Sequence, residues 1–508
     1  MFSFEWRTFL FRDTLQSTLV AITCLIVFLW IWESWDRITQ RRNSPPGPWG
    51  WPMIGNLFQM GKDPYVTFTN MRDKYGDIFS FKLGRYNTVV LNGVNTIRKA
   101  LVNQPEAFAG RPDFHSVRYI SGGKSLSLSA YGPRWKLHRQ IAGKAMRKLI
   151  QNRRNPIEDV ISHEARHLVD SLLHNDLQFD PTREIYLSVG SIIYTICFGD
   201  DTASRNDKDF VLFLENFKDF IDYFTTGNLV DILPWTRYFT RGKIERFIEI
   251  NKVRETLRRS KEHEIRQRFD PDNLNGMTDA LIKATLDTDD ELKEAVGLTD
   301  DHILSTIEGL IGAGFSTVAT TLSWSVLYMA AHPDIQTDVQ NELDKVIGDR
   351  DPCASDRYDL PFTDACITEI LRHSSILPLS LPHATTRDVI LDGFDIPKDT
   401  LVLINLWSLT RDPSVFEDPE TFNPRRFLTK DGALDKVKMD MFLPFGAGRR
   451  RCMGEYLAKL EVFLFFTMLL KKCTIQKPSN VKINFERTFR LSLDPNPFEV
   501  MIHLRRQN

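Results

Sequence analysis

The sequence predicts a mainly α-helical protein with small β-sheets, preceded by a single N-terminal membrane helix. Three observations predict this class: apolar stripes at helical spacing dominate, strand-like runs are few and short, and one uncharged stretch lies near the N-terminus. Of the 508 residues, 42% are hydrophobic and 26% are charged, which is typical of a globular chain with a large core. No repeat divides the chain, so we expect one continuous globular domain behind an anchor.

The predicted membrane helix occupies residues 14–32, which carry no charge. At about 1.5 Å per residue, a helix of this length just crosses a bilayer core of about 30 Å. More arginines follow this stretch than precede it, so we expect the bulk of the chain to lie in the cytosol. No small-residue cleavage site follows, which favours an uncleaved anchor. We therefore divide the chain into an anchor and linker, 1–44, and a globular domain, 45–508, that begins at a rigid proline segment.

The periodicity of the globular domain predicts eight helices and four short strands. The helices are 134–150, 158–175, 184–198, 243–267, 299–332, 334–347, 362–373 and 454–470, and the strands are 78–83, 88–91, 389–391 and 401–404. The polar stretch 270–299 is expected to be a solvated connection before the longest helix.

The charge of the chain is balanced in total but segregated along the sequence. The sum is −1, yet residues 114–157 contain ten Lys and Arg and no Asp or Glu. Such a block can bind nucleic acid or anionic lipid, but no nucleic-acid motif accompanies it, so we expect no nucleic-acid partner. Six cysteines without a C-x-x-C spacing exclude a disulfide scaffold and a cysteine-rich zinc module.

A zinc site is the first candidate for chemistry. Residues 163–167 match H-E-x-x-H, which would place His163 and His167 on one helix face with Glu164 as general base. A third ligand is required, and Glu184 is the only nearby candidate. An amphipathic helix whose polar face carries these residues explains the pattern better, and a zinc hydrolase remains the less favoured alternative.

The second candidate lies inside the longest predicted helix. Gly309, Gly312 and Gly314 fall within six residues, and each costs roughly 1 kcal/mol relative to alanine in a helix interior. Either a flat or bulky group approaches this backbone, or another helix crosses it at the small residues. Ser316 and Thr317 can donate hydrogen bonds to carbonyls one turn back, which leaves their hydroxyls able to hold a water.

The third candidate surrounds Cys452. This thiol lies just before a predicted helix N-terminus and follows three arginines, so we expect it to be held as a thiolate, as an axial ligand of haem iron requires. Gly454 would let the helix lie close to a flat macrocycle, Phe445 would screen the sulfur, and Arg450 would reach a haem propionate. The alternative is a structural cysteine beside a solvated basic run, which leaves Phe445 and the glycines unexplained.

These residues resemble the cytochrome P450 superfamily. Its cysteine signature F-x-x-G-x-R-x-C-x-G is matched at every fixed position, and four further marks stand in the expected order: Trp135-x-x-x-Arg139, Ala313-Gly314-x-x-Thr317, Glu369-x-x-Arg372 and Pro424-Arg425-Arg426-Phe427. The resemblance covers the chain from residue 45 to about residue 500. Its details are similar to the animal microsomal branch, closest to the family 1 enzymes that oxidise aromatic hydrocarbons, with steroid 17-hydroxylases as near relatives.

The resemblance implies a cytochrome P450 fold in which residues 45–508 form the haem-thiolate catalytic domain. Cys452 would be the iron ligand of haem b. The other implied site residues are Trp135, Arg139, His383 and Arg450 at the propionates, Phe445 and Gly454 beside the haem, Ala313, Gly314, Ser316 and Thr317 in catalysis, and Glu369, Arg372 and Arg426 in a structural ion-pair network. Phe114, Phe217, Phe220 and Phe224 are candidate pocket rings, although aromatic residues on helices are more often plain core.

Two positions depart from the family pattern. Ser316 stands where Asp or Glu is usual, so proton delivery is altered, because a hydroxyl relays a proton but does not supply it as an acid. Arg425 stands where Glu is usual, which puts one surface ion pair in doubt.

The function implied is that of a monooxygenase. It would insert one oxygen atom from O₂ into a small hydrophobic substrate, an aromatic xenobiotic or a steroid-like molecule, with electrons from NADPH. No nicotinamide or flavin fingerprint is evident, so NADPH–cytochrome P450 reductase would deliver the electrons, with cytochrome b5 as a further candidate partner, and the basic block would attract the reductase. The expected location is the endoplasmic reticulum membrane, single-pass, with the catalytic domain cytosolic. Ser316 keeps open a haem-thiolate isomerase or dehydratase of oxygenated lipids, and a non-catalytic haem sensor is a further alternative.

Overall fold

The structure is a computed structural model in which most of the globular domain is described. It describes residues 16–18, 20, 23–24, 27–28, 43–152, 156–174, 177–199, 208–225, 229–479, 482–490 and 492–505, without the side chains at 218, 222, 224 and 225. Most of the predicted membrane helix 14–32 therefore lies outside the described residues. Among those described, one helix, α12 (Asp300–Ala331), is long and apolar enough to cross a membrane, but it is largely buried in the globule.

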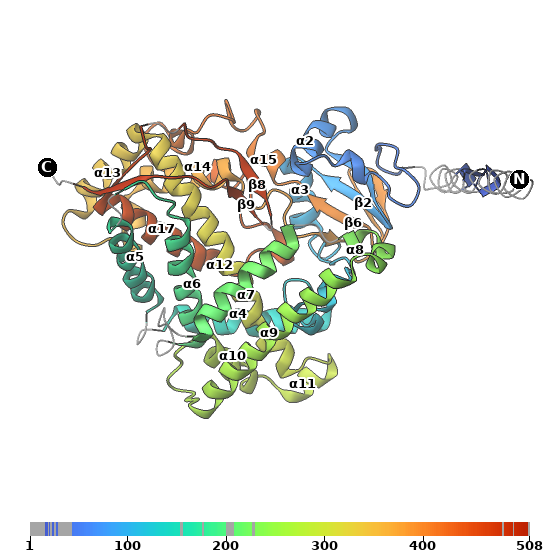
Figure 1. The fold of residues 1–508 in the computed structure, drawn as a ribbon, viewed down its shortest axis with the longest axis horizontal. Coiled ribbons are helices and arrows are strands. Elements are labelled where there is room, and N and C mark those ends of the chain that lie inside the picture. Colours follow the sequence, from blue (N-terminus) through green and yellow to red (C-terminus); the bar gives the residue numbers. More distant parts are fainter. Residues whose placement is uncertain are drawn as a thin grey trace, which may run out of the picture.

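A helical body forms most of the molecule, and the sheet that contains β2 (Tyr86–Leu91) and β6 (Leu401–Ile404) lies at one end of it (Figure 1). The helices are α2 (Pro64–Tyr75), α3 (Val94–Arg98), α4 (Pro133–Ile150), α5 (Ile157–Leu173), α6 (Thr182–Phe198), α7 (Lys208–Thr225), α8 (Leu229–Ile232), α9 (Arg241–Gln267), α10 (Met277–Leu286), α11 (Asp290–Ala295), α12, α13 (Pro333–Ile347), α14 (Pro361–Ser374), α15 (Trp407–Thr410), α16 (Lys436–Met439) and α17 (Glu455–Lys472). Short turns of other helix types are η1 (Leu57–Gln59), η2 (Lys99–Asn103), η3 (Ser116–Arg118), η4 (Ile120–Gly123), η6 (Pro234–Tyr238), η7 (Ala354–Asp359), η8 (Pro424–Phe427) and η9 (Gly448–Arg450).

The main sheet has four strands in the order β1-β2-β6-β3. β1 and β2 pair antiparallel with Ile78 opposite Leu91, β2 and β6 pair parallel, and β3 and β6 pair antiparallel. Three two-stranded sheets complete the β-structure. The strands are β1 (Ile78–Leu83), β2 (Tyr86–Leu91), β3 (His383–Ala384), β4 (Val389–Leu391), β5 (Phe394–Ile396), β6 (Leu401–Ile404), β7 (Cys473–Gln476), β8 (Arg487–Phe489), β9 (Leu493–Pro495) and β10 (Met501–Leu504).

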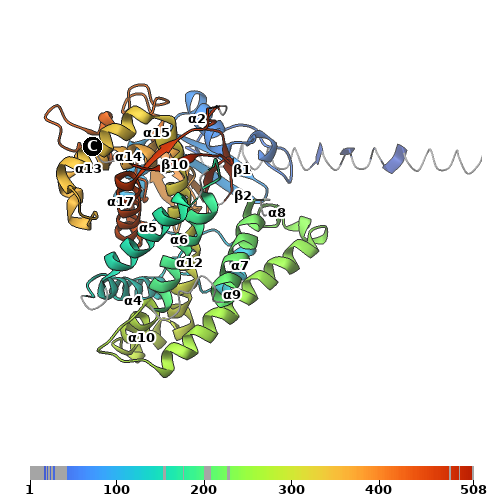
Figure 2. The same cartoon turned by 60° about the vertical axis from the view of Figure 1, so that its left-hand side comes forward.

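Helix α12 is the centre of the core and packs against α6, α10, α14 and α17. α6 lies beside α12 in both ribbon views (Figures 1 and 2). A Cβ atom at Gly314 would lie 2.7 Å from Cδ1 of Ile193 on α6, so a larger residue would have to displace that side chain at the crossing of the two helices. Gly309, in contrast, has no neighbouring atom within 4 Å of a Cβ position. Of the two explanations for these glycines, the helix crossing therefore accounts for Gly314.

All eight predicted helices and four predicted strands are present, with ends shifted by at most two residues. The expectation for 270–299 is wrong, because this stretch forms α10 and α11. Met277 and Leu281 of α10 are fully buried, and the helix packs against α4 and α12. Its apolar residues are interrupted by threonines and a lysine, which hid the stripe in a segment with many acidic residues. Helices α2 and α7 were also not predicted.

Candidate functional site

The loop before α17 carries Cys452 at the point where the helix begins. The backbone N–H of Cys452 donates to the carbonyl of Phe445 at 3.0 Å, which closes the loop. Gly448 has a φ of +69°, and a Cβ atom there would collide with the carbonyl oxygen of Leu101. Cys452 is exposed, whereas Cys197, Cys366 and Cys473 are buried. The loop therefore presents one accessible thiol at a helix N-terminus, and the conformation of the loop requires a glycine at 448.

The ionisation of Cys452 differs from the prediction. Cys452 is accessible, but the surrounding chain removes enough water to raise the pKa of its thiol. The Gly454 amide, Arg139 and Arg451 lower the pKa, but desolvation outweighs them. The expectation that the helix and the arginines alone hold a thiolate is therefore wrong. A bound metal ion would supply the missing charge, because it deprotonates a coordinating thiol.

Three arginines gather beside this loop without an anionic partner. Arg450 donates to the carbonyls of Ala109, Leu126 and Ser129 at 2.8, 3.2 and 2.6 Å. Arg111 donates to the Ser127, Leu381 and Pro382 carbonyls at 2.9, 3.2 and 2.7 Å, and Arg139 donates to that of Arg451. In the described part of the chain, none of the three forms an ion pair with a carboxylate. We call Arg111, Arg139 and Arg450 the open arginine cluster.

The members of the open arginine cluster repel one another. Burial and the neighbouring Arg111 and Arg139 lower the pKa of Arg450 to about 8. Burial and Arg139 lower the pKa of Arg111 to about 10. Several buried cations without an anion are costly unless an anion binds among them. The cluster is thus built to receive an anionic group.

Trp135 and His383 complete the surroundings of the cluster. The indole N–H of Trp135 donates to the Leu126 carbonyl at 2.8 Å, and the Arg450 guanidinium lies 4.2 Å from its ring centroid. His383 lies with Nδ1 2.6 Å from the carbonyl oxygen of Phe108. Burial, Arg111 and Arg450 lower the pKa of His383 to about 3, so its imidazole is neutral at neutral pH. Trp135 therefore packs against the guanidinium of Arg450, and a neutral His383 lies near Arg111 and Arg450.

The donor set fits a haem. An accessible thiol stands at a helix start, a cluster of arginines without a carboxylate partner among the described residues lies beside it, and Gly454 places no side chain next to the sulfur. A thiolate is a known axial ligand of haem iron, and guanidinium groups bind the carboxylates of propionates with strong charge-assisted hydrogen bonds. Cys452 would hold the iron, and Arg111, Arg139 and Arg450 would hold the propionates.

A second arginine cluster, between α14 and η8, contains its own anion. Arg372 donates to both carboxylate oxygens of Glu369, at 2.7 and 2.8 Å, and Arg426 donates to Oε1 of Glu369 at 3.1 Å. Neither Glu369 nor Arg372 has any exposed surface. Arg372 also donates to the carbonyls of Thr410 and Pro419. We call Glu369, Arg372 and Arg426 the closed arginine cluster, and it fixes α14 to the segment around η8.

In the predicted catalytic turn of α12, Ala313 and Thr317 are accessible, whereas Ser316 is buried. Ala313 is exposed within an otherwise buried helix, and the hydroxyl of Thr317 donates to the Ala313 carbonyl at 2.8 Å, as predicted. The hydroxyl of Ser316 is buried and has no hydrogen-bond partner among the described residues. The expected bond from Ser316 to the carbonyl one turn back is therefore wrong, because its side chain points into the packed side of the helix.

The predicted pocket rings lie in two different parts of the structure. Phe114 lies beside the sheet, with its ring 5.4 Å from that of Tyr86. Phe217 of α7 packs edge-on against Phe315 of α12 at 4.7 Å, and Phe220 lies 4.2 Å from the guanidinium of Arg254. The prediction for Phe224 lies outside the described side chains. Phe217 and Phe220 thus form the wall where α7 meets α9 and α12.

The zinc-site alternative does not survive in the structure. His163 and His167 are exposed on α5, and Glu164 accepts a hydrogen bond from the Ser191 hydroxyl at 3.0 Å. Among the described residues, no three His, Cys, Asp or Glu side chains are placed to hold a metal ion. The H-E-x-x-H pattern is the polar face of an amphipathic helix.

Sequence reasoning missed Arg111. An isolated β-bridge between Gly110 and Ala384 places this arginine beside β3 and His383. These lie about 270 residues further along the chain. No spacing motif marks it. The weak signal available was that Arg111 precedes a proline, which favours extended backbone at that position.

The basic block of residues 114–157 is partly neutralised by carboxylates outside it. Lys124, Lys136 and Lys148 pair with Asp301, Glu106 and Asp287, at 2.7, 3.1 and 2.8 Å. Lys144 and Arg147 of α4 are exposed and form no ion pair with a described residue. The uncompensated surface is therefore smaller than the sequence indicates.

Known proteins resemble this chain over most of its length. The family model described as "Cytochrome P450" matches residues 45–502. The chain is 38% identical to cytochrome P450 1A5 of Gallus gallus over 89% of this chain and 87% of that protein. It is 36% identical to cytochrome P450 1A2 of Canis lupus familiaris, over 94% and 95% of the two chains, and 35% identical to cytochrome P450 1A1 of Felis catus, over 93% of each.

Proposed function

The chain belongs to the cytochrome P450 family, and from this premise we propose its substrate class, its electron donor and its location. As a family member it is a monooxygenase that binds haem b, receives electrons from a reductase and acts on a hydrophobic substrate. We propose that the substrate is a small aromatic xenobiotic or a steroid-like molecule, that NADPH is the electron source, and that residues 45–508 form the catalytic domain. The observation that carries this proposal is the accessible Cys452 thiol beside the open arginine cluster.

Each element of the site has a distinct task in this reaction. Haem bound through Cys452 supplies the activation of O₂, with the thiolate as electron donor to iron. The open arginine cluster orients the cofactor by holding its propionates. Thr317 holds its hydroxyl against the Ala313 carbonyl, on the accessible side of α12, where it can donate to or accept from a water. The closed arginine cluster has a structural task, since its members bind one another and the backbone of residues 410–423.

The aromatic wall supports the choice of substrate. Phe217, Phe220 and Phe315 contact one another across α7 and α12 and offer flat apolar surfaces. Flat aromatic or steroidal molecules bury such surfaces, and offset or edge-on ring contacts add to that burial. We assign Phe114, beside the sheet, to the opposite side of the same pocket.

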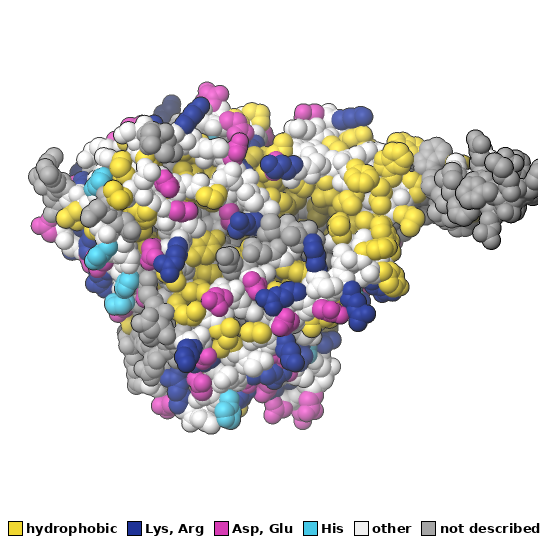
Figure 3. All heavy atoms as spheres, viewed as in Figure 1, with side chains coloured by type: hydrophobic (Ala, Val, Ile, Leu, Met, Phe, Trp, Pro, Cys, Tyr) yellow, Lys and Arg dark blue, Asp and Glu magenta, His cyan; other side chains and the backbone are white. Residues whose placement is uncertain are grey.

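We propose a single-pass anchor at 14–32 in the endoplasmic reticulum membrane, assisted by an apolar patch on the globule. Trp49, Trp51, Met53 and Phe58 are exposed before β1, and Trp235, Tyr238 and Phe239 are exposed after α8. The two groups adjoin, because the amide of Arg85 in the β1–β2 turn donates to the carbonyl of Ile232 at 3.3 Å. Hydrophobic side chains gather at this end of the face that Figure 3 shows. Tryptophan and tyrosine favour the membrane interface, so this face is suited to contact lipid.

In contrast to the membrane, which would contact the apolar patch, the electron donor would dock on a basic surface. Lys144 and Arg147 remain free of described ion pairs on α4, and such cations attract an acidic flavoprotein at low ionic strength. We propose NADPH–cytochrome P450 reductase as this partner, with cytochrome b5 as a second donor to the same surface. Charge reversal of both residues would slow reduction of the haem and weaken its dependence on salt.

The proposal is tested with the purified haem-loaded protein. The reduced, CO-bound form should show the red-shifted Soret band of thiolate ligation, and Cys452→Ala should abolish that band. With reductase, NADPH and O₂, a polycyclic aromatic hydrocarbon or a steroid should yield a hydroxylated product. Formation of rearranged product from a lipid peroxide, without reductase and with no NADPH-dependent hydroxylation, would instead identify an isomerase and overturn the proposal.

A further inference from the structure

Arg254 of α9 is a half-buried cation that no carboxylate among the described residues neutralises. Its Nη1 is buried without a hydrogen-bond partner, and its Nη2 makes one long hydrogen bond, to the backbone carbonyl of Glu308 at 3.3 Å. The carboxylate of Glu308 is already used, because Oε1 accepts from Arg258 at 2.8 Å and Oε2 accepts from the hydroxyl of Ser121 at 2.5 Å. Desolvation lowers the pKa of Arg254, although the charge of Glu308 opposes this. The guanidinium therefore retains a donor for an acceptor from outside the chain.

Other cations of α9 show what Arg254 lacks. Four of them have two carboxylate partners each: Arg246 pairs with Asp219 and Glu249, Arg258 with Glu262 and Glu308, Arg259 with Glu255 and Asp301, and Lys261 with Asp209 and Glu264. A charge removed from water is normally paired, and an unpaired one is costly until an opposite charge binds. The group that completes Arg254 is therefore an anion.

The guanidinium of Arg254 lies against the proposed substrate pocket. Its central carbon is 4.2 Å from the ring centroid of Phe220, which belongs to the aromatic wall. Its Nη2 is 3.5 Å from the position that a Cβ atom would take at Gly312, which is an ordinary contact distance. Packing alone does not require this glycine, but the missing side chain leaves space beside the guanidinium. Gly312 directly precedes Ala313, which is exposed in the predicted catalytic turn, so Arg254 lies between the aromatic wall and that turn.

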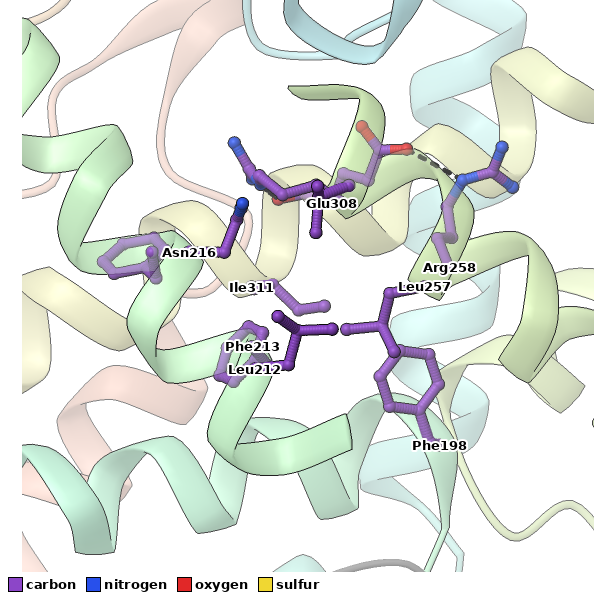
Figure 4. Close-up of a pocket in the computed structure, with 11 residues that line it drawn as sticks. Phe198, Leu212, Phe213, Asn216, Leu257, Arg258, Glu308 and Ile311 are labelled. Carbon is purple, nitrogen blue, oxygen red and sulfur yellow. Dashed lines mark hydrogen bonds and ion pairs between the residues drawn. The ribbon is translucent and has the colours of Figure 1, made fainter. Parts of the chain in front are cut away.

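A cavity of about 20 Å³ adjoins Arg254 and has room for one group of the size of a water molecule or a carboxylate oxygen. Phe217 of the aromatic wall and Asn216 also line it, and the Glu308–Arg258 ion pair lies at its side (Figure 4). Oδ1 of Asn216 is buried without a partner among the described residues. A half-turn of this amide would exchange Oδ1 for Nδ2, which donates hydrogen bonds. The cavity can thus offer an anion donors from two side chains.

We propose that the substrate carries a carboxylate that binds Arg254, so that the enzyme acts on flat aromatic or steroid-like acids. This inference rests on the proposed function and adds the charge of the substrate to it. One carboxylate oxygen enters the cavity and accepts from Nη1, while the apolar body of the substrate lies against Phe217 and Phe220. A carboxylate is favoured over a neutral acceptor, because charge-assisted hydrogen bonds are about twice as strong as neutral ones. Arg254 is a specificity-determining residue that fixes one end of the substrate and takes no part in oxygen transfer.

Two fluorescent probes with the same aromatic body test the proposal, pyrene-1-butyric acid and pyrene-1-butanol. At pH 7 the acid is ionised, and fluorescence titration should show that the haem-loaded protein binds it about tenfold more tightly than the alcohol. Arg254→Met removes the charge but keeps an unbranched side chain. It should raise the dissociation constant of the acid about ten- to hundredfold, as expected for a lost hydrogen bond between charged groups, and change that of the alcohol less than about twofold. A crystal structure of the acid complex should place a carboxylate oxygen about 3 Å from Nη1.

Arg246→Met is the matched control. Arg246 also lies on α9, but it pairs with Asp219 and Glu249 at 2.5 and 3.0 Å and does not line the cavity. Its substitution should leave the dissociation constants of both probes at their wild-type values. Arg254→Lys is a second variant, which keeps the charge with a different geometry and should retain part of the preference for the acid.

Three outcomes would overturn the assignment of Arg254. They are equal affinity of the wild-type protein for acid and alcohol, equal weakening of both probes by Arg254→Met, and equal weakening of the acid by Arg254→Met and Arg246→Met. The CO-bound thiolate band, recorded for each variant, shows that the haem-loaded protein is intact. Absence of that band in the wild-type protein would refute the proposed function itself, whereas an intact band with no preference for the acid refutes only the role of Arg254.

Discussion

The open and the closed arginine clusters differ in one component, a carboxylate. In the closed cluster, Glu369 lies between Arg372 and Arg426 and accepts from both. In the open cluster, Arg111, Arg139 and Arg450 donate only to backbone carbonyls, and they lower one another's pKa. The closed cluster is almost wholly buried, whereas the open cluster is half-buried and lies beside Cys452. The closed cluster is therefore complete when the chain has folded, whereas the open cluster is completed only by an anion from outside the chain.

This difference separates structural residues from ligand-binding residues without reference to any relative. Buried charges are tolerated when they are paired and hydrogen-bonded, and an incomplete set identifies the charge of the missing partner. Substitutions in the closed cluster should act on folding in every state of the protein. Substitutions in the open cluster should act mainly on the protein that has bound its cofactor.

The largest effect is expected for Glu369→Gln. The variant leaves Arg372 and Arg426 buried without an anion, and breaking a buried pair in this way typically costs about 3–5 kcal/mol. The free energy of unfolding, measured with denaturant, should fall by this amount in the haem-free and the haem-bound protein alike.

Glu461→Gln provides the control for that variant. Glu461 of α17 is also fully buried, but desolvation raises its pKa to about 8, so its carboxyl is largely protonated at neutral pH. Replacing a neutral carboxyl with an amide should change the unfolding free energy by less than about 1 kcal/mol at pH 7. A loss for Glu461→Gln equal to that for Glu369→Gln would show that burial, and not the pairing with arginine, determines the cost.

Arg450→Met should affect the haem-bound protein far more than the haem-free protein. In the haem-free protein the change relieves the repulsion from Arg111 and Arg139, which offsets the lost bonds to carbonyls, so little net destabilisation is expected. In the haem-bound protein it removes charge-assisted hydrogen bonds to a propionate, which should weaken haem binding about ten- to hundredfold. The rate of haem transfer to an excess of an acceptor protein measures this loss. Arg449→Met is the control, because Arg449 is exposed and pairs with Glu106; equal haem loss from both variants would contradict the prediction.

The two clusters should also differ in their response to acid. Burial and nearby arginines lower the pKa of His383, beside the open cluster, to about 3 and that of His373, beside the closed cluster, to about 2. In the unfolded chain both imidazoles take up a proton near pH 6.5. In the window below pH 6.5 the unfolded chain therefore binds more protons, and each histidine lowers the stability of the haem-free protein by about 1.4 kcal/mol per pH unit.

Haem should change this response at one histidine only. Propionates would neutralise the charge of Arg111 and Arg450, which would raise the pKa of His383. The pH range over which this histidine destabilises the protein would then be narrower. The pKa of His373 should not move, because its partners, the Tyr328 hydroxyl at 2.6 Å and the Glu420 carbonyl at 2.9 Å, belong to the protein. NMR titration of the two imidazoles with and without haem measures both shifts, and a shift of equal size at His373 would contradict the distinction.

The sequence predicted the parts of the site that are local in the chain. The Cys452 loop, the Thr317 bond to Ala313 and the Glu369–Arg372 pair each depend on residues a few positions apart, so spacing is sufficient to predict them. Arg111 was missed because β3 brings it to His383 from a distant part of the chain, which no spacing records. The thiolate expectation for Cys452 failed for a related reason, since the desolvation of the thiol depends on the packing of the whole loop.

The smallest effect is expected at Arg425, where the chain departs from the family pattern. Its guanidinium pairs with Asp338 at 2.7 Å, but 66% of its side chain is exposed, against 7% for the neighbouring Arg426. Exposed ion pairs contribute about 0–1 kcal/mol and weaken with salt, so Arg425→Glu should lower the unfolding free energy by less than about 1 kcal/mol, and by less still in high salt. Arg426→Gln should cost more than about 2 kcal/mol at any salt concentration, because it leaves Glu369 with one fewer partner inside the protein. Equal losses for these adjacent arginines would mean that the closed arginine cluster extends to the surface, and that exposure does not set its boundary.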